Sequence, residues 1–96
     1  MKMLFLIYDA DFDEDVMQML AGCPITGYTK WDRVLGKGKG SDPRLDDAVL
    51  PGYNCAVATF IEDELKNEIC KAANNLLGKL GGTGFAMFEL PVNRVI

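Results

Sequence analysis

Two segments of the chain carry apolar side chains at nearly every position, which predicts strands that are buried on both faces. These segments run from Lys2 to Asp9 and from Asn54 to Ile61. Successive side chains of a strand point to opposite faces of the sheet, so neither face of these two strands is suited to water. Ile25 to Leu35, rich in Thr, Tyr, Trp and Val, and Phe85 to Leu90 predict two further strands. The tail from Pro91 to Ile96 is expected to add an edge strand.

Helical periodicity appears in two other segments. Asp11 to Ala21 places apolar residues on one face, with acids in the first turn and Gly22 to end the helix. A second helix is expected to begin at the acidic Glu62 to Glu64 and to be ended by glycine. The apolar stripe of the first helix consists of Phe12, Val16, Met19 and Leu20, and that of the second of Leu65, Ile69, Ala72, Ala73, Leu76 and Leu80.

The resulting order, β-α-β-β-α-β, predicts an α+β fold of the ferredoxin-like kind, with two helices on one face of an antiparallel sheet. A chain of 96 residues is expected to form one domain, residues 1–96. If the second apolar face of the sheet stayed exposed to water, so small a domain would lose much of the free energy that burial of apolar surface can contribute. We therefore expect a second copy to cover that face, which makes the protein a homo-oligomer.

Charge and composition narrow the range of possible functions and locations. A net charge of −4 counts against nucleic-acid binding, which normally needs a basic face. The apolar opening from Met3 to Tyr8 is too short to span a membrane, and no targeting segment is evident. A cytoplasmic protein that is not embedded in a membrane is the expectation.

The residues for several common chemistries are missing from the sequence. It contains no histidine, which excludes Ser-His and Cys-His nucleophile pairs and the commonest metal ligand. Cys23, Cys55 and Cys70 form no C-x-x-C pair, so we expect free and mostly buried thiols. The acidic stretch from Asp9 to Asp15 does not fit a calcium loop, because Glu14 stands where glycine is needed. Solvated acids at a helix start are the favoured interpretation.

The long connection from Gly36 to Gly52 is the segment most suggestive of function. Loops of this length inside small domains are usually functional or disordered. Gly36, Gly38 and Gly40 lack both standard nucleotide-binding spacings, but successive glycine amides beside lysines can form an anion-binding nest. Glycine needed only for the backbone angles of the loop explains the triplet about equally well.

In order along the chain, several short motifs resemble PII-type nitrogen regulatory proteins. They are Ile25 to Thr29 with the glycines that follow, Leu50-Pro51 before the third strand, Gly78 to Gly81, and the closing Pro91 to Ile96. The resemblance implies a ferredoxin-like homotrimer whose sheets face one another. It also implies a T-loop, here Gly36 to Gly52, that docks on a membrane transporter or a metabolic enzyme. Such a protein is a regulator and not an enzyme.

The resemblance further implies an effector site in the cleft between subunits, for ATP, ADP or another small anionic or nucleotide ligand. The family has a basic residue near the position of Phe85 and an acid on the third strand near the position of Ala56, and this chain has neither. The chain also ends before the position of the family's C-terminal arginine pair. The effector residues that carry over are Thr29, Gly36, Lys37, Gly38, Lys39, Lys79 and Gly81, and those expected at the docking tip are Asp42, Arg44, Leu45, Asp46, Asp47, Val49 and Leu50.

Two alternatives share this predicted architecture. One is a metal-associated trimer similar to the CutA proteins, against which the lack of histidine counts. The other is a hydrolase similar to acylphosphatases, which would need an arginine-bearing loop after the first strand, where this chain has Asp9 to Asp15.

Overall fold

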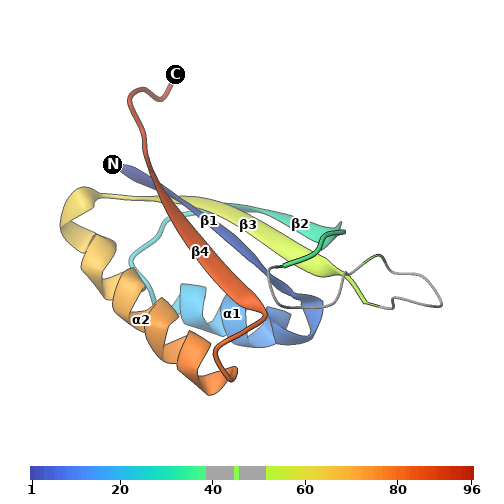
Figure 1. Cartoon of the computed structure of the whole chain (residues 1–96). Coiled ribbons are helices and arrows are strands. Elements are labelled where there is room, and N and C mark those ends of the chain that lie inside the picture. The colour runs from blue at the N-terminus through green and yellow to red at the C-terminus, as the bar shows by residue number, and fades with distance from the viewer. Residues whose placement is uncertain (39–44, 46–51) are drawn as a thin grey trace.

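The computed structural model describes residues 1–38, 45 and 52–96, which form a four-stranded antiparallel sheet with two helices on one face (Figure 1). The strands have the order β2-β3-β1-β4. No helix in these ranges is both long and apolar enough to cross a membrane. In chain order the elements are β1 (Lys2–Asp9), the 3-10 turn η1 (Ala10–Phe12), α1 (Asp13–Ala21), β2 (Tyr28–Val34), β3 (Asn54–Ile61), the 3-10 turn η2 (Asp63–Leu65), α2 (Lys66–Lys79) and β4 (Phe85–Pro91).

The predicted ferredoxin-like fold is confirmed, and the differences lie at the ends of elements. β1 and β3 have the expected bounds, whereas each helix begins later than expected because a 3-10 turn precedes it. The expected edge strand in the C-terminal tail is not formed. Residues 92–96 have no regular structure, although the Val92 amide donates to the Met1 carbonyl at 3.4 Å. Pro91 lacks an N–H group with which to extend a ladder.

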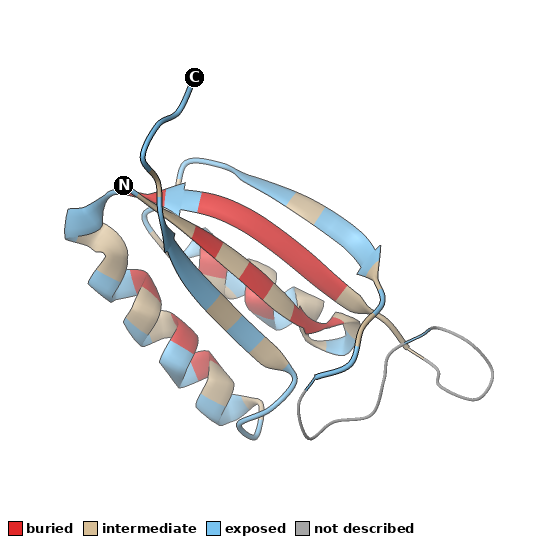
Figure 2. Cartoon of the chain, turned by 45° about the horizontal axis from the view of Figure 1, so that its top comes forward, coloured by how far each residue is buried: buried red, intermediate tan, exposed pale blue. Residues whose placement is uncertain are grey.

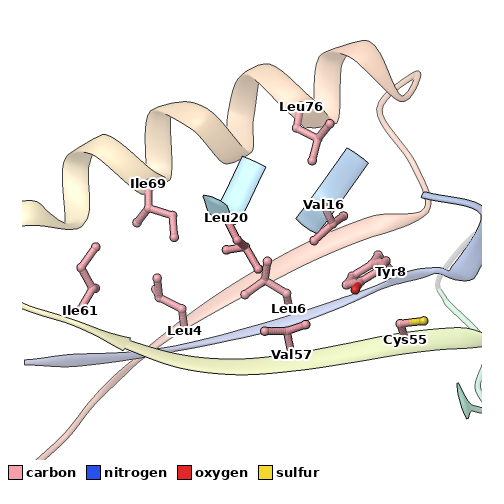
Figure 3. Packing of buried hydrophobic residues seen from close by; sticks show 10 residues of the cluster. All are labelled: Leu4, Leu6, Tyr8, Val16, Leu20, Cys55, Val57, Ile61, Ile69 and Leu76. Carbon is pink, nitrogen blue, oxygen red and sulfur yellow. The ribbon is translucent and has the colours of Figure 1, made fainter. Parts of the chain in front are cut away.

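The hydrophobic core lies between the helices and one face of the sheet (Figure 3). β1 and β3 contribute every second side chain to it, as the pleat of a strand requires. The helices contribute residues spaced four or seven apart, as the sequence pattern predicts. The buried cluster consists of Leu4, Leu6, Tyr8, Val16, Leu20, Cys55, Val57, Ile61, Ile69 and Leu76.

The opposite face of the sheet is apolar and open. Residues on the alternate positions of β1 and β3 face this side, so the prediction that both faces are apolar is confirmed. Figure 2 shows that burial is concentrated on β1 and β3, while the edge strands β2 and β4 are largely exposed. Trp31, Phe60, Phe88 and Leu90 remain 44–52% exposed. Trp31 packs against Phe5 across this face, with 6.1 Å between ring centroids.

A buried tyrosine, an acid and a lysine join three elements on the helix side of the sheet. The Tyr8 hydroxyl of β1 donates to Asp13 Oδ1 at 2.6 Å, and Lys30 Nζ of β2 donates to Asp13 Oδ2 at 2.7 Å. Asp9 is also buried, and its carboxylate accepts from the Asp11 amide. The expectation of solvated acids was therefore wrong for Asp9 and Asp13, because the fold places a phenol, a lysine and a free backbone amide beside them.

The pKa shifts of this group follow from its contacts. Burial acts to raise the pKa of the Asp13 carboxyl, but the hydrogen bonds from Lys30 and Tyr8 outweigh burial and hold that pKa below its usual value. The hydrogen bond to Asp13 is the main cause of a raised pKa at Lys30. Burial, followed by the bond to Asp13, raises the pKa of the Tyr8 phenol.

Replacing Asp13 with Asn should lower the free energy of unfolding at pH 7 by about 1–2 kcal/mol, because charge-assisted hydrogen bonds contribute more than neutral ones and Asp13 is only partly exposed. A carboxyl whose pKa is lowered by folding contributes stability above its unfolded pKa of about 3.9, and that contribution is lost as the pH falls through the folded pKa. The deficit of D13N should therefore be constant from pH 5 to pH 8 and should shrink below about pH 4.

Urea unfolding of both proteins across this pH range measures the effect. Asp15→Asn, which removes an exposed acid from the same first turn of α1, is the matched control and should change stability little. A D13N deficit that is the same at pH 3 and pH 7 would contradict the assignment.

Candidate functional site

A cleft of about 760 Å³ opens where β1 ends, β3 and β4 begin and the segment after β2 passes. Its lining combines a glycine-containing turn, the start of the long loop and apolar side chains of the open sheet face. The residues that line it are Phe5, Ile7, Tyr8, Asp9, Phe12, Val34, Leu35, Gly36, Lys37, Gly38, Asn54, Ala56, Gly82, Thr83, Gly84, Phe85, Ala86 and Phe88.

Pairing of the central strand brings these distant segments to one end of the sheet. β1 pairs along its length with β3 on one side and with β4 on the other. At its end, the Asp9 amide donates to the Gly84 carbonyl at 2.9 Å, and the Ala10 amide donates to the Tyr53 carbonyl at 3.1 Å. The turn before β4 and the segment before β3 are thus held to the same end of β1.

The turn between α2 and β4 forms one wall of the cleft. The Gly82 amide donates to the Leu77 carbonyl and the Gly81 amide to the Gly78 carbonyl, a pattern that closes the C-terminal end of a helix with glycine in the left-handed region. Gly84 has a φ of 79°, and a Cβ atom there would stand 2.6 Å from Phe12 Cε2. Only glycine therefore fits at position 84 without displacing the Phe12 ring.

The base of the long loop forms the facing wall. The register between β2 and β3 shifts between Trp31 and Val34, and Val34 then pairs with Asn54. The Arg33 guanidinium lies 4.5 Å from the centre of the Tyr53 ring, which ties the two sides of the loop together at its base. Beyond this contact, Gly36, Lys37 and Gly38 run along the cleft.

The cleft unites three of the predicted effector residues. Gly36, Lys37 and Gly38 line it, as do Phe85 and Ala56, the two positions at which the family resemblance implies charged residues.

The other predicted effector residues lie elsewhere. Thr29 is exposed on β2, where it pairs with Ala58, and Lys79 is exposed in the last turn of α2. Gly81 caps that helix and does not line the cleft. Lys39 lies outside the described residues.

Of the predicted docking residues, only Leu45 is described, and its side chain is 41% exposed. Asp42, Arg44, Asp46, Asp47, Val49 and Leu50 lie outside the described residues.

Sequence reasoning missed the polar residues of the cleft. Asn54, at the start of β3, and Thr83, in the glycine turn, both line it. Their position could have been inferred from topology, because in the β-α-β-β-α-β order the end of β1, the start of β3 and the start of β4 lie at one end of the sheet. No local motif marks either residue.

The cysteines and acids carry no evident chemistry in the part of the chain that the structure describes. Cys55 is buried and Cys23 and Cys70 are half-buried, and all three thiols are free, as predicted. The Cys55 thiol donates to the Asp32 carbonyl at 3.2 Å, and burial raises its pKa. Among the described residues, no group of three or more His, Cys, Asp or Glu side chains could hold a metal ion.

Comparison with solved structures identifies the fold. CPII from Thiomonas intermedia K12, a nitrogen regulatory PII-like protein solved with ADP, AMP and bicarbonate, superposes with a TM-score of 0.71 at 17% identity, over 97% of this chain and 88% of its own. The chain has the PII-like fold. A DUF3240 family protein from Shewanella baltica OS155 superposes with a TM-score of 0.71 at 14% identity, over 98% of this chain and 91% of its own.

A third similar structure has the same PII-like fold. This protein from Thermus thermophilus, described as PII-like and signalling, superposes with a TM-score of 0.65 at 12% identity, over 93% of this chain and 83% of its own. No protein-family model and no curated protein matches the sequence. The resemblance drawn from the motifs is thus confirmed at the level of the PII-like fold.

A series of alanine substitutions at glycines should separate backbone strain from close packing in the cleft wall. A Cβ atom at position 81 would have no other atom within 4 Å. Gly81→Ala should therefore lower the free energy of unfolding by about 1–2 kcal/mol, the cost of holding alanine in the left-handed conformation. At position 84 alanine has the same left-handed strain and also clashes with the Phe12 ring. Gly84→Ala should therefore lower the free energy of unfolding by about 2–4 kcal/mol. Thermal and urea unfolding measure both.

Gly78→Ala is the matched control for this series. Gly78 is helical and has open space around it, so alanine should stabilise the protein by about 0.5–1 kcal/mol. Equal losses of unfolding free energy in G81A and G84A would show that contact with the Phe12 ring adds nothing to the cost of alanine at position 84.

Proposed function

We propose that the protein is a non-enzymatic PII-like regulator that binds a small anionic or nucleotide effector in the cleft and presents its long loop to a partner protein. The working form is a homotrimer in the cytoplasm, and the partner is a membrane transporter or a metabolic enzyme. The observation that carries the proposal is the cleft itself, in which the base of the loop meets the glycine turn and an apolar wall.

The position of the cleft supports effector sensing. Gly36, Lys37 and Gly38 form part of the cleft and also begin the long loop. A ligand that contacts these residues therefore acts directly on the start of the loop. CPII, which shares the fold, is described as bound to ADP, AMP and bicarbonate, so an adenine nucleotide or bicarbonate is the first ligand class to test.

The open face of the sheet supports the oligomer. Several apolar residues that line the cleft, among them Phe5, Ile7 and Phe88, also belong to this face. A second copy packed on the face would cover exposed aromatic side chains and would close the cleft from that side. Assembly and effector binding would then depend on the same surface.

Isothermal titration should detect binding of at least one of ATP, ADP, cyclic AMP and bicarbonate. Thr83→Trp should weaken that binding about tenfold or more, because a bulky ring on this exposed cleft residue fills the space. Thr26→Trp places the same ring on an exposed residue outside the cleft lining and should leave binding unchanged. Absence of heat with all four ligands would remove the effector-sensing part of the proposal.

Size-exclusion chromatography with light scattering should give the mass of a trimer at micromolar concentration. Phe60→Ser should shift the protein toward monomer, because Phe60 is 49% exposed on the open face, opposite Met3 of β1. Tyr28→Ser is the matched control: Tyr28 is 55% exposed but pairs with Thr59 on the helix side of the sheet. A wild-type protein that runs only as monomer would contradict the assembly.

A further inference from the structure

The strand β2 contains one residue more than β3 just before the long loop begins. Two pairs of the ladder define this place: Trp31 with Ala56, and Val34 with Asn54. Three positions separate the two members on β2, whereas two positions separate those on β3. Asp32 and Arg33 therefore stand opposite Cys55 alone, which is the arrangement of a β-bulge. Bulges bend a strand and change the direction of its side chains.

Contacts on the helix side of the sheet hold both bulge residues. The thiol of Cys55, a core residue, donates to the Asp32 carbonyl at 3.2 Å. The Asp32 carboxylate lies 3.5 Å from Lys30 Nζ, which is itself bound to α1. The Arg33 guanidinium lies over the Tyr53 ring at 4.5 Å. Alternation along β3 gives position 53 the same side of the sheet as Cys55, so the Arg33 side chain is on the helix side.

A regular β2 would send the Arg33 side chain to the open face instead. Trp31 is on that face, where it packs against Phe5, and side chains two positions apart on a strand share a face. The extra residue gives the place to Val34, which pairs with Asn54.

The open face carries no cation in the strands that the structure describes. None of the residues that the register places on it is Lys or Arg, and the one acid, Asp9, is buried at its end. A guanidinium enclosed between two apolar surfaces would lose its hydration without a matching partner, which is unfavourable. Over the Tyr53 ring, Arg33 keeps an exposed position and a favourable cation–π contact.

We infer that the bulge is a device that keeps the open face fit for assembly. It diverts Arg33 to the helix side and leaves Val34 at the position that faces a second copy. This inference rests on the proposed function, because it concerns the surface on which we propose that the copies pack.

Glutamate placed at each of two adjacent positions tests the diversion. Val34→Glu should weaken assembly at least about tenfold, measured by light scattering over a dilution series, because a carboxylate then enters the apolar contact. Arg33→Glu is the matched control: the same residue one position earlier lies on the helix side and should leave the mass unchanged at each concentration. Circular dichroism checks that both variants are folded.

Deletion of Arg33 separates the diverted side chain from the bend of the strand. Without the extra residue, Asp32 alone stands opposite Cys55 and Val34 stays opposite Asn54, so the open face is the same as in the wild-type protein. The deletion variant should therefore assemble like the wild-type protein. Loss of assembly by a folded deletion variant would show that the bend itself is required, and would overturn the inference.

The outcomes separate this inference from the proposed function. A wild-type protein that assembles, together with a V34E variant that assembles equally well, overturns the inference and leaves the proposed assembly standing. Greater sensitivity to glutamate at position 33 than at position 34 also overturns the inference alone. A wild-type protein that is monomeric at every concentration overturns the proposed assembly, and the inference with it.

Discussion

Pairing of β1 along its whole length with two neighbours is the constraint on which the rest of the structure depends. β3 and β4 both run antiparallel to it, so the starts of both strands lie beside its end. The hydrogen bonds from the Asp9 and Ala10 amides extend this pairing to Gly84, just before β4, and to Tyr53, just before β3. The cleft exists at this end because three separate segments of chain are held there by main-chain bonds.

The two faces of the sheet have separate roles. One face packs against α1 and α2 and forms the core (Figure 3). The other keeps its aromatic residues exposed and runs into the cleft through Phe5 and Phe88. Because removal of apolar surface from water is favourable, this open face is the surface on which we propose that a second copy packs.

Much of the fold was predictable because it rests on periodicity. The alternate burial in β1 and the helical stripe of α2 follow from repeats of two and 3.6 residues, which tertiary structure does not alter. Helix starts were less predictable, because Asp13 and Lys66 follow 3-10 turns that continue the same apolar pattern. The solvated state expected for Asp9 and Asp13 was wrong because their partners, above all Lys30 on β2, are distant in sequence.

The sequence by itself determined the order of elements, the apolar character of both faces of β1 and β3, and the glycines at which α1 and α2 end. These features are local, since each depends on residues within a few positions of one another. Only the tertiary structure decided that Lys37, Asn54, Thr83 and Phe88 share one cleft, while Gly81 caps a helix outside it. That grouping arises from strand register and main-chain hydrogen bonds between distant segments, which no local pattern encodes.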